Sequence, residues 1–135
     1  MKKTVSGLNI QWPWSELLIN GSKSVETRGY PLPKKYIGVE LAIIETAGPR
    51  GRREAGIEFA RIIGTVVFEE SFEYVSREKW EKDRKRHRVS VDDPLFKYDP
   101  RVKKFGWVVK KVTRLPRPLP APKPRGIVFA SECHI

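Results

Sequence analysis

The chain has 135 residues, of which 39% are hydrophobic, so we expect one compact domain over residues 1–135 and no room for a second. Its short apolar runs predict no membrane-spanning helix and no signal peptide, and a single cysteine, Cys133, excludes an internal disulfide. These features indicate a reducing, cytoplasmic compartment.

The positive charge is concentrated in the second half of the chain. The formal net charge is +11; residues 76–125 hold 17 Lys and Arg against 6 Asp and Glu, and the remaining residues hold 10 of each. A segregated excess of this kind attracts polyanions. We therefore favour a nucleic-acid partner over a basic surface that serves only solubility or heat stability.

The first half of the chain predicts strands around one short helix. Residues 4–10 form the first strand. Pro13 suits the first turn of a helix, because its ring presets the backbone angle, and Gly21 tolerates the left-handed conformation that ends one. An apolar stripe beginning at Trp14 gives this helix about two turns. The strands that follow are 24–28, 38–45 and 57–68, and Gly64 marks a bend in the last of them.

The second half predicts one solvated helix, two strands and a connector. Ser76 is an N-cap for a helix over 76–86, with Trp80 as its anchor. Residues 69–75 lead out of the sheet, and residues 89–100 form an ordered loop or a short helix. Prolines at every second position from 116 to 124 predict a stiff, extended connector between strands 105–112 and 126–133. The fold class is α+β: a small, mostly antiparallel β-barrel with a few short helices.

The residues after the first helix carry most of the potential chemistry. Lys23, Glu26 and Arg28 fall within six residues of one another. A strand's period of two places Glu26 and Arg28 on one face, and Lys23 can reach the same space from the turn. The commonest use of such residues is structural, as an ion pair beside a solvated lysine. Two cations next to a carboxylate can also bind a ligand or catalyse a reaction.

Two runs on either side of the short helix, Gln11-Trp12-Pro13-Trp14 and Gly21-x-Lys23-x-x-Glu26-x-Arg28, resemble the signature of the ASCH domain, a member of the PUA-like superfamily. The segments at 105–108 and 114–116 are similar to the C-terminal part of such domains, so the resemblance spans nearly the whole chain. It implies a PUA-like barrel in which the signature lines a cleft for RNA or a nucleoside.

Binding of RNA or a nucleoside is the first functional hypothesis. In it, Lys23 and Arg28 contact a phosphate or a base edge, and Glu26 accepts a hydrogen bond from a base amino group. Either Trp12 or Trp14 offers a stacking face, which contributes roughly 1–3 kcal/mol per base.

Hydrolysis is the alternative. Here Lys23 is a nucleophile or an electrostatic helper, Glu26 a general base and Arg28 an oxyanion stabiliser. The resemblance implies either a metal-independent ribonuclease or an amidohydrolase on a modified nucleoside such as N4-acetylcytidine. In such amidohydrolases the motif lysine works with a Thr three residues later and a distant Glu. This chain has Glu26 at that position, so Ser24 or Thr27 would have to supply the hydroxyl. Binding therefore ranks first, ribonuclease activity second and deacetylation third.

The densest basic cluster of the chain is Arg84, Lys85, Arg86, His87 and Arg88. It is either an exposed helix end, where cations meet the negative end of the helix dipole, or an edge that grips phosphates. Two histidines and one cysteine without ligand spacing predict no metal site, and no P-loop or dinucleotide fingerprint indicates a cofactor. The expected partner is RNA or a nucleoside. A ribonucleoprotein or transcription complex stays open as a further partner, and a membrane is not expected.

Overall fold

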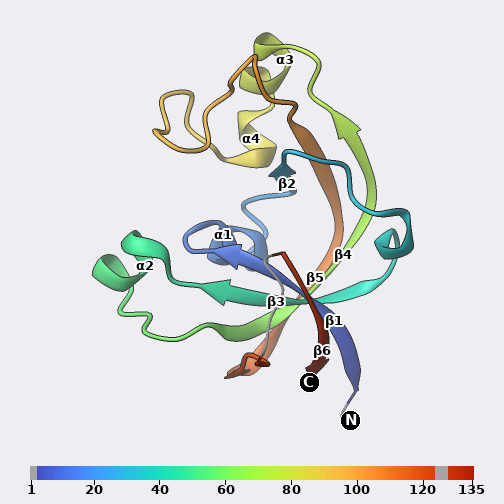
Figure 1. The fold of residues 1–135 in the computed structure, drawn as a ribbon, viewed down its shortest axis with the longest axis vertical. Helices are drawn as coiled ribbons and strands as arrows, with labels where there is room; N and C mark the ends of the chain where they lie inside the picture. Colours follow the sequence, from blue (N-terminus) through green and yellow to red (C-terminus); the bar gives the residue numbers. More distant parts are fainter. Residues whose placement is uncertain (1–2, 124–127) are drawn as a thin grey trace.

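Six strands form one sheet in the computed structural model, which describes residues 3–123 and 128–135 (Figure 1). The strand order is β2-β5-β4-β3-β1-β6, and every neighbouring pair is antiparallel except β1 with β3. The predicted α+β, mostly antiparallel fold is confirmed. The strands are β1 (Thr4–Gln11), β2 (Val25–Arg28), β3 (Glu40–Thr46), β4 (Arg61–Glu73), β5 (Phe105–Pro120) and β6 (Phe129–His134). The helices are α1 (Trp14–Ile19), the 3-10 turn η1 (Lys34–Tyr36), α2 (Gly48–Glu54), α3 (Arg77–Lys82) and α4 (Arg84–His87).

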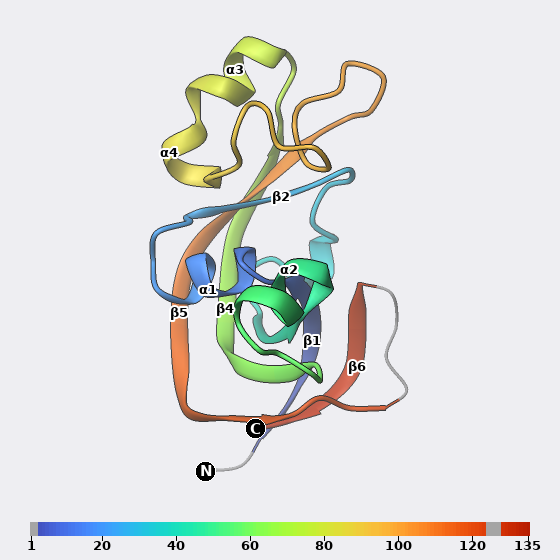
Figure 2. The same cartoon turned by 90° about the vertical axis from the view of Figure 1, so that its left-hand side faces the viewer.

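The two longest strands, β4 and β5, curl the sheet. They pair from Glu73 opposite Phe105 to Arg61 opposite Pro120, with register shifts next to Gly64 and on both sides of Phe68. The shift next to Gly64 leaves residues 115–118 of β5 without a partner in β4. Figure 2 shows both strands running along the tall axis of the molecule and bending at the lower end. Because a bulge bends a strand and increases its twist, these shifts let the sheet wrap around its core.

Gly64 lies where β4, β5 and α1 approach most closely. A Cβ atom at this position would lie 2.3 Å from the carbonyl oxygen of Thr113 and 2.5 Å from Cδ1 of Ile19. The β3–β4 ladder also shifts register opposite this residue, between Ile43 and Ile44. The bend predicted at Gly64 is therefore present, and the missing side chain is what lets β5 and α1 pack against it.

Two apolar clusters hold the elements that matter for function. The main core joins the sheet to α1 and contains Leu8, Leu18, Leu41, Phe68 and Trp107, all fully buried. A second cluster joins β2 to α3 and to the chain after α4, and consists of Val25, Tyr74, Trp80 and Val89. The second cluster fixes the basic helices beside β2.

Several predicted boundaries were wrong. Residues 69–75 are predicted to leave the sheet, but β4 continues to Glu73 because its outer half pairs with the start of β5. β5 likewise continues through the prolines at 116, 118 and 120, where a connector is predicted. The helix predicted over 76–86 is broken at Asp83 into α3 and α4. Residues 124–127, which belong to the predicted connector and last strand, lie outside the described residues.

Neither a membrane span nor a metal cluster is found in the described ranges. Every helix there is too short or too polar to cross a membrane. Those same ranges contain no group of three or more His, Cys, Asp or Glu side chains placed to hold a metal ion.

Candidate functional site

The turn after α1 carries the motif residues toward the sheet. Asn20 caps the helix, Gly21 has a φ of +87°, and the backbone N–H of Lys23 donates to the carbonyl of Leu17 at 2.9 Å. The positive φ is the reason that glycine suits this helix stop. The chain then enters β2, which pairs with β5 and places Glu26 opposite Trp107.

Lys23 is buried, with 1% of its surface exposed. Its ammonium donates to the carbonyl of His87, lies 3.7 Å from Oε1 of Glu26 and sits 5.3 Å from the ring centre of Trp14. Burial disfavours the charged form and lowers the pKa of Lys23 to about 8, against the opposing attraction of Glu26. Lys23 is therefore not the solvated turn residue of the structural interpretation.

Glu26 and Arg28 form the ion pair that the structural interpretation expects. Arg28 donates Nε to Oε2 of Glu26 at 2.9 Å, and its Nη2 lies 2.7 Å from the same oxygen. Nη2 also donates to the carbonyl of Asn9 at 2.9 Å, and the guanidinium stacks 5.5 Å from the ring centre of Trp107. These contacts fix the carboxylate in one orientation and leave Oε1 on the side of Lys23.

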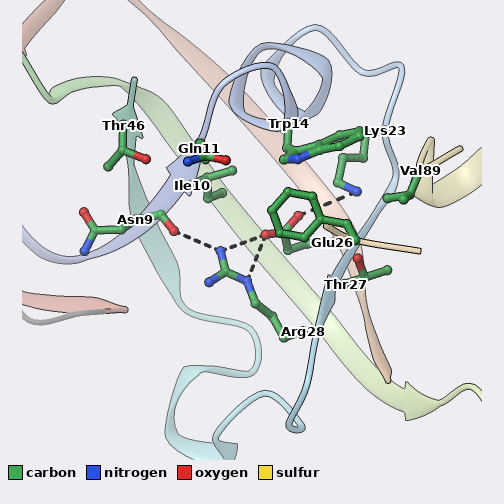
Figure 3. A pocket seen from close by; sticks show the side chains of 11 residues that line it. Asn9, Ile10, Gln11, Trp14, Lys23, Glu26, Thr27, Arg28, Thr46 and Val89 are labelled. Atoms are coloured by element: carbon green, nitrogen blue, oxygen red, sulfur yellow. Dashed lines mark hydrogen bonds and ion pairs between the residues drawn. The ribbon is translucent and has the colours of Figure 1, made fainter. Parts of the chain in front are cut away.

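The three motif side chains meet in a cleft with a volume of about 270 Å³. Figure 3 shows Lys23 and Arg28 approaching Glu26 from opposite sides, with the ring of Trp14 beside Lys23. The cleft thus has a charged floor and an aromatic wall. Its lining comprises Asn9, Ile10, Gln11, Trp14, Lys23, Glu26, Thr27, Arg28, Thr46, Val89 and Phe96.

Sequence reasoning did not assign several of the lining residues to the site, although Gln11 stands in the run that resembles the ASCH signature. Asn9 and Gln11 come from β1, Thr46 from the end of β3, and Phe96 from the long segment between α4 and β5. The Phe96 ring meets Trp14 edge to face at 5.9 Å between ring centres. The polar residues that end β1 and β3 were a usable signal, because those two strands are parallel neighbours and end at the same edge of the sheet. Nothing in the sequence placed Phe96 here.

The two tryptophans of the motif occupy different places. Trp14 lines the cleft. Trp12 is absent from the lining; it packs beside Gly51 of α2, and the guanidinium of Arg50 lies 5.7 Å from its ring centre. Of the two stacking candidates, the structure therefore brings Trp14 to Lys23, Glu26 and Arg28 but not Trp12.

His87 does not belong to the exposed basic cluster. It is fully buried, its ring stacks on Trp80 at 4.4 Å, and its Nδ1 accepts from the backbone N–H of Val89 at 2.9 Å. The other ring nitrogen, Nε2, therefore carries the proton and donates to the carbonyl of Trp80 at 2.6 Å. Burial lowers the pKa of His87 to about 4, so the ring is neutral and structural at physiological pH.

The remaining cations of the cluster face two surfaces. Arg86 donates to Asp83 at 2.7 Å and lies over the ring of Phe72, on the β4 side. Arg84, Lys85 and Arg88 line a shallow pocket of about 440 Å³ around Leu17 of α1. We refer to these three cations as the α4 patch. None of the three forms an ion pair with another described residue.

The α4 patch adjoins the cleft through the backbone. The carbonyl of His87 accepts a hydrogen bond from the ammonium of Lys23, and the carbonyl of Arg86 accepts one from the N–H of Ser24 at 2.9 Å. Val89, which follows Arg88, lines the cleft itself. These hydrogen bonds hold α4 against the turn and the strand that carry the motif.

The fold is similar to solved structures of an ASCH protein from Zymomonas mobilis. The crystal structure of that ASCH gives a TM-score of 0.64 at 16% identity, covering 85% of this chain and 72% of that chain. The crystal structure of one of its mutants gives a TM-score of 0.64 at 16% identity and covers 85% of this chain and 74% of that chain. The crystal structure of a second mutant gives a TM-score of 0.63 at 14% identity and covers 93% of this chain and 86% of that chain. Neither the protein-family sequence models nor the curated proteins contain a match to this chain.

Proposed function

We propose that this chain, which has the fold of the ASCH proteins, binds RNA or a nucleoside in the cleft lined by Lys23, Glu26 and Arg28. The observation that carries the proposal is the buried triad itself. Burying an ammonium group and a carboxylate is costly, and here both groups border an open cleft with an aromatic wall. Buried charges at the floor of a cleft are typical of ligand-binding sites.

Each motif residue has a distinct role in this proposal. Arg28 holds Oε2 of Glu26, and Oε1 lies beyond hydrogen-bond distance of Lys23, so Oε1 keeps its capacity to accept from a base amino group. Lys23 supplies positive charge for a phosphate or a base carbonyl. Trp14 provides the apolar wall against which a base can pack.

The α4 patch supports a phosphate-bearing ligand. Arg84, Lys85 and Arg88 are exposed cations that form no ion pair among the described residues, next to a cleft that takes the base. When such cations neutralise the phosphates of a polyanion, the counter-ions condensed on the polyanion are released, and this release strengthens binding.

Binding of a pool of short RNAs and modified nucleosides, followed by mass spectrometry of the retained species, tests the proposal. Glu26→Gln should lower the affinity for the retained species by about 10-fold or more, because a charged acceptor contributes about 1.5–3 kcal/mol. Glu45→Gln is the matched control. Glu45 is equally buried and is also held by an arginine, Arg61, but it does not line the cleft. Retention that is unchanged in Glu26→Gln, or lost equally in both variants, would contradict the proposal.

Hydrolysis is a second candidate, favoured by the state of Lys23. A pKa of about 8 leaves part of the amine neutral near physiological pH, so Lys23 can accept a proton as an ordinary lysine cannot. Thr27 lines the cleft and offers a hydroxyl group, whereas Ser24 does not line it. A ribonuclease and an amidohydrolase on a modified nucleoside are both compatible with these groups.

The two candidates predict opposite pH dependences, one for the affinity of binding and one for the rate of product formation. If Lys23 only binds an anion, affinity falls as pH rises through about 8 and the positive charge is lost. If Lys23 acts as a base, product formation rises through the same range. The assay is repeated with Lys23→Met, which keeps the length of the side chain without its charge. Turnover that survives in this variant would exclude the hydrolytic role of Lys23.

A further inference from the structure

A second and larger hollow lies on the side of the cleft away from the α4 patch. We call it the α2 groove. It has a volume of about 810 Å³ and runs between α2, the start of β4 and the end of β5. Its lining comprises Thr46, Ala47, Gly48, Arg52, Gly56, Ile57, Glu58, Phe59, Ala60, Arg61, Pro118, Leu119, Pro120, Ala121 and Lys123.

The α2 groove combines an exposed aromatic ring with cations. Phe59 is 78% exposed, an unusual state for a phenylalanine. Arg52, Arg61 and Lys123 line the same groove, against Glu58 as the single acid among its described lining residues. Arg61 is neutralised by Glu45 at 2.9 Å, whereas Arg52 and Lys123 form no ion pair with a described residue.

The α2 groove adjoins the cleft. Thr46 lines both of them. Gln11 lines the cleft and rests on Gly48 of the groove, where a Cβ atom would lie 2.3 Å from Nε2 of Gln11. Gly48 also has a φ of +61°, and its missing side chain leaves room for the side chain of Gln11 between the two hollows.

We propose that the α2 groove is a second nucleotide subsite, which binds the part of a single-stranded RNA that adjoins the nucleotide held in the cleft. A base stacks on Phe59, and Arg52 and Lys123 contact the backbone phosphates. This inference rests on the proposed function and deepens it, because it makes an oligonucleotide, rather than a free nucleoside, the ligand. An exposed aromatic ring among cations is the usual platform for single strands, since bases paired in a duplex cannot stack on protein side chains.

Competition experiments with RNA mono-, di- and tetranucleotides of random sequence test the proposal, with a fluorescently labelled oligonucleotide as the displaced probe. The tetranucleotides should bind more tightly than the mononucleotides. Phe59→Ala should remove most of that gain, by about 5- to 150-fold, which is the usual contribution of one stacked base. Phe59→Trp should retain or increase it, because the larger ring still stacks. Phe59 is exposed, so neither change should disturb folding.

A charge-matched pair tests the phosphate contacts. Arg52 and Arg53 are neighbours on α2 and both exposed, but only Arg52 lines the groove. Arg52→Gln should weaken tetranucleotide binding several-fold and leave mononucleotide binding unchanged, whereas Arg53→Gln should change neither.

The possible outcomes separate this inference from the proposed function. Mononucleotide binding that is lost in Glu26→Gln, together with no gain in affinity for tetranucleotides, would overturn the second subsite and leave the cleft intact. A gain in affinity with RNA length that persists in Phe59→Ala and Arg52→Gln would also overturn it. The α2 groove would then be a candidate site for a protein segment instead. Binding of neither ligand would overturn both proposals.

Discussion

Lys23 and His87 are buried basic residues, and the ammonium of Lys23 donates a hydrogen bond to the backbone carbonyl of His87. Burial lowers the pKa of both, to about 8 for Lys23 and about 4 for His87. The two buried groups have different surroundings. Lys23 borders the cleft and can exchange its proton with a ligand, whereas His87 contacts the ring and the carbonyl of Trp80 and holds α4 in place.

Acid should destabilise the protein through His87. The unfolded chain binds a proton at the ordinary histidine pKa of about 6.5, but the folded chain does so only near 4, so the unfolding free energy falls as pH drops through this window. The contribution of this group is about 3 kcal/mol when the whole window has been crossed, and about 2 kcal/mol of it is lost between pH 7 and pH 5. Urea unfolding at pH 7 and pH 5 measures it.

His87→Gln provides the control for this measurement, because an amide can donate and accept hydrogen bonds but does not titrate. The variant should lose less stability than the wild type between pH 7 and pH 5. An equal loss in both proteins would show that carboxylates, rather than His87, cause the acid sensitivity.

The junction of β4, β5 and α1 depends on Gly64. Gly64→Ala should lower the unfolding free energy by about 2 kcal/mol or more, because the added Cβ would lie 2.3 Å from the backbone of β5 and the two strands would have to separate. Gly29→Ala is the matched control, since its Cβ would meet only the carbonyl of Lys103 at 3.7 Å. Thermal unfolding compares the two. A similar melting temperature for both variants would contradict the packing argument.

The elements that could be predicted from the sequence are those set by local chemistry. The end of α1 at Gly21, the cap of α3 at Ser76 and the bend at Gly64 each depend on one residue with a particular backbone or hydrogen-bonding property. The motif was also visible, because Lys23, Glu26 and Arg28 are close in the sequence. That Lys23 is buried was not visible, since its burial depends on α4 and Trp14.

The elements that the sequence did not reveal depend on distant partners. β4 extends to Glu73 only because the start of β5 pairs with it. Phe96 reaches the cleft by its contact with Trp14, and no periodic pattern marks it. His87 looked like one more basic residue, and only the ring of Trp80 and the N–H of Val89 make it a core side chain. The second subsite, too, joins segments from three elements.

Salt should weaken RNA binding, because the chain carries a net charge of +11 and the α4 patch adjoins the cleft. For single strands the logarithm of affinity falls with the logarithm of salt by about 0.7 for each phosphate contacted. Changing Arg84, Lys85 and Arg88 together to Gln should therefore reduce this slope by about 2. Anisotropy titrations at several salt concentrations measure the slope.

A second triple variant separates the α4 patch from the overall charge. Changing Lys34, Lys35 and Arg53 to Gln removes the same charge from residues that line neither the cleft, the α2 groove nor the α4 pocket. This variant should keep nearly the wild-type slope. Equal slopes in the two triple variants would mean that the net charge, rather than the patch, attracts the RNA.

The prolines of β5 have a consequence for how copies of this protein behave in a crowded solution. Beyond Val109, β5 pairs with β4 on one edge, and no described strand pairs with its other edge. Pro116, Pro118 and Pro120 carry no backbone N–H, and the first two fall in the four residues of β5, 115–118, that have no partner in β4. A strand from another molecule therefore finds no hydrogen-bond donor at these three positions, and the prolines help to protect the longest described strand of the protein against aggregation.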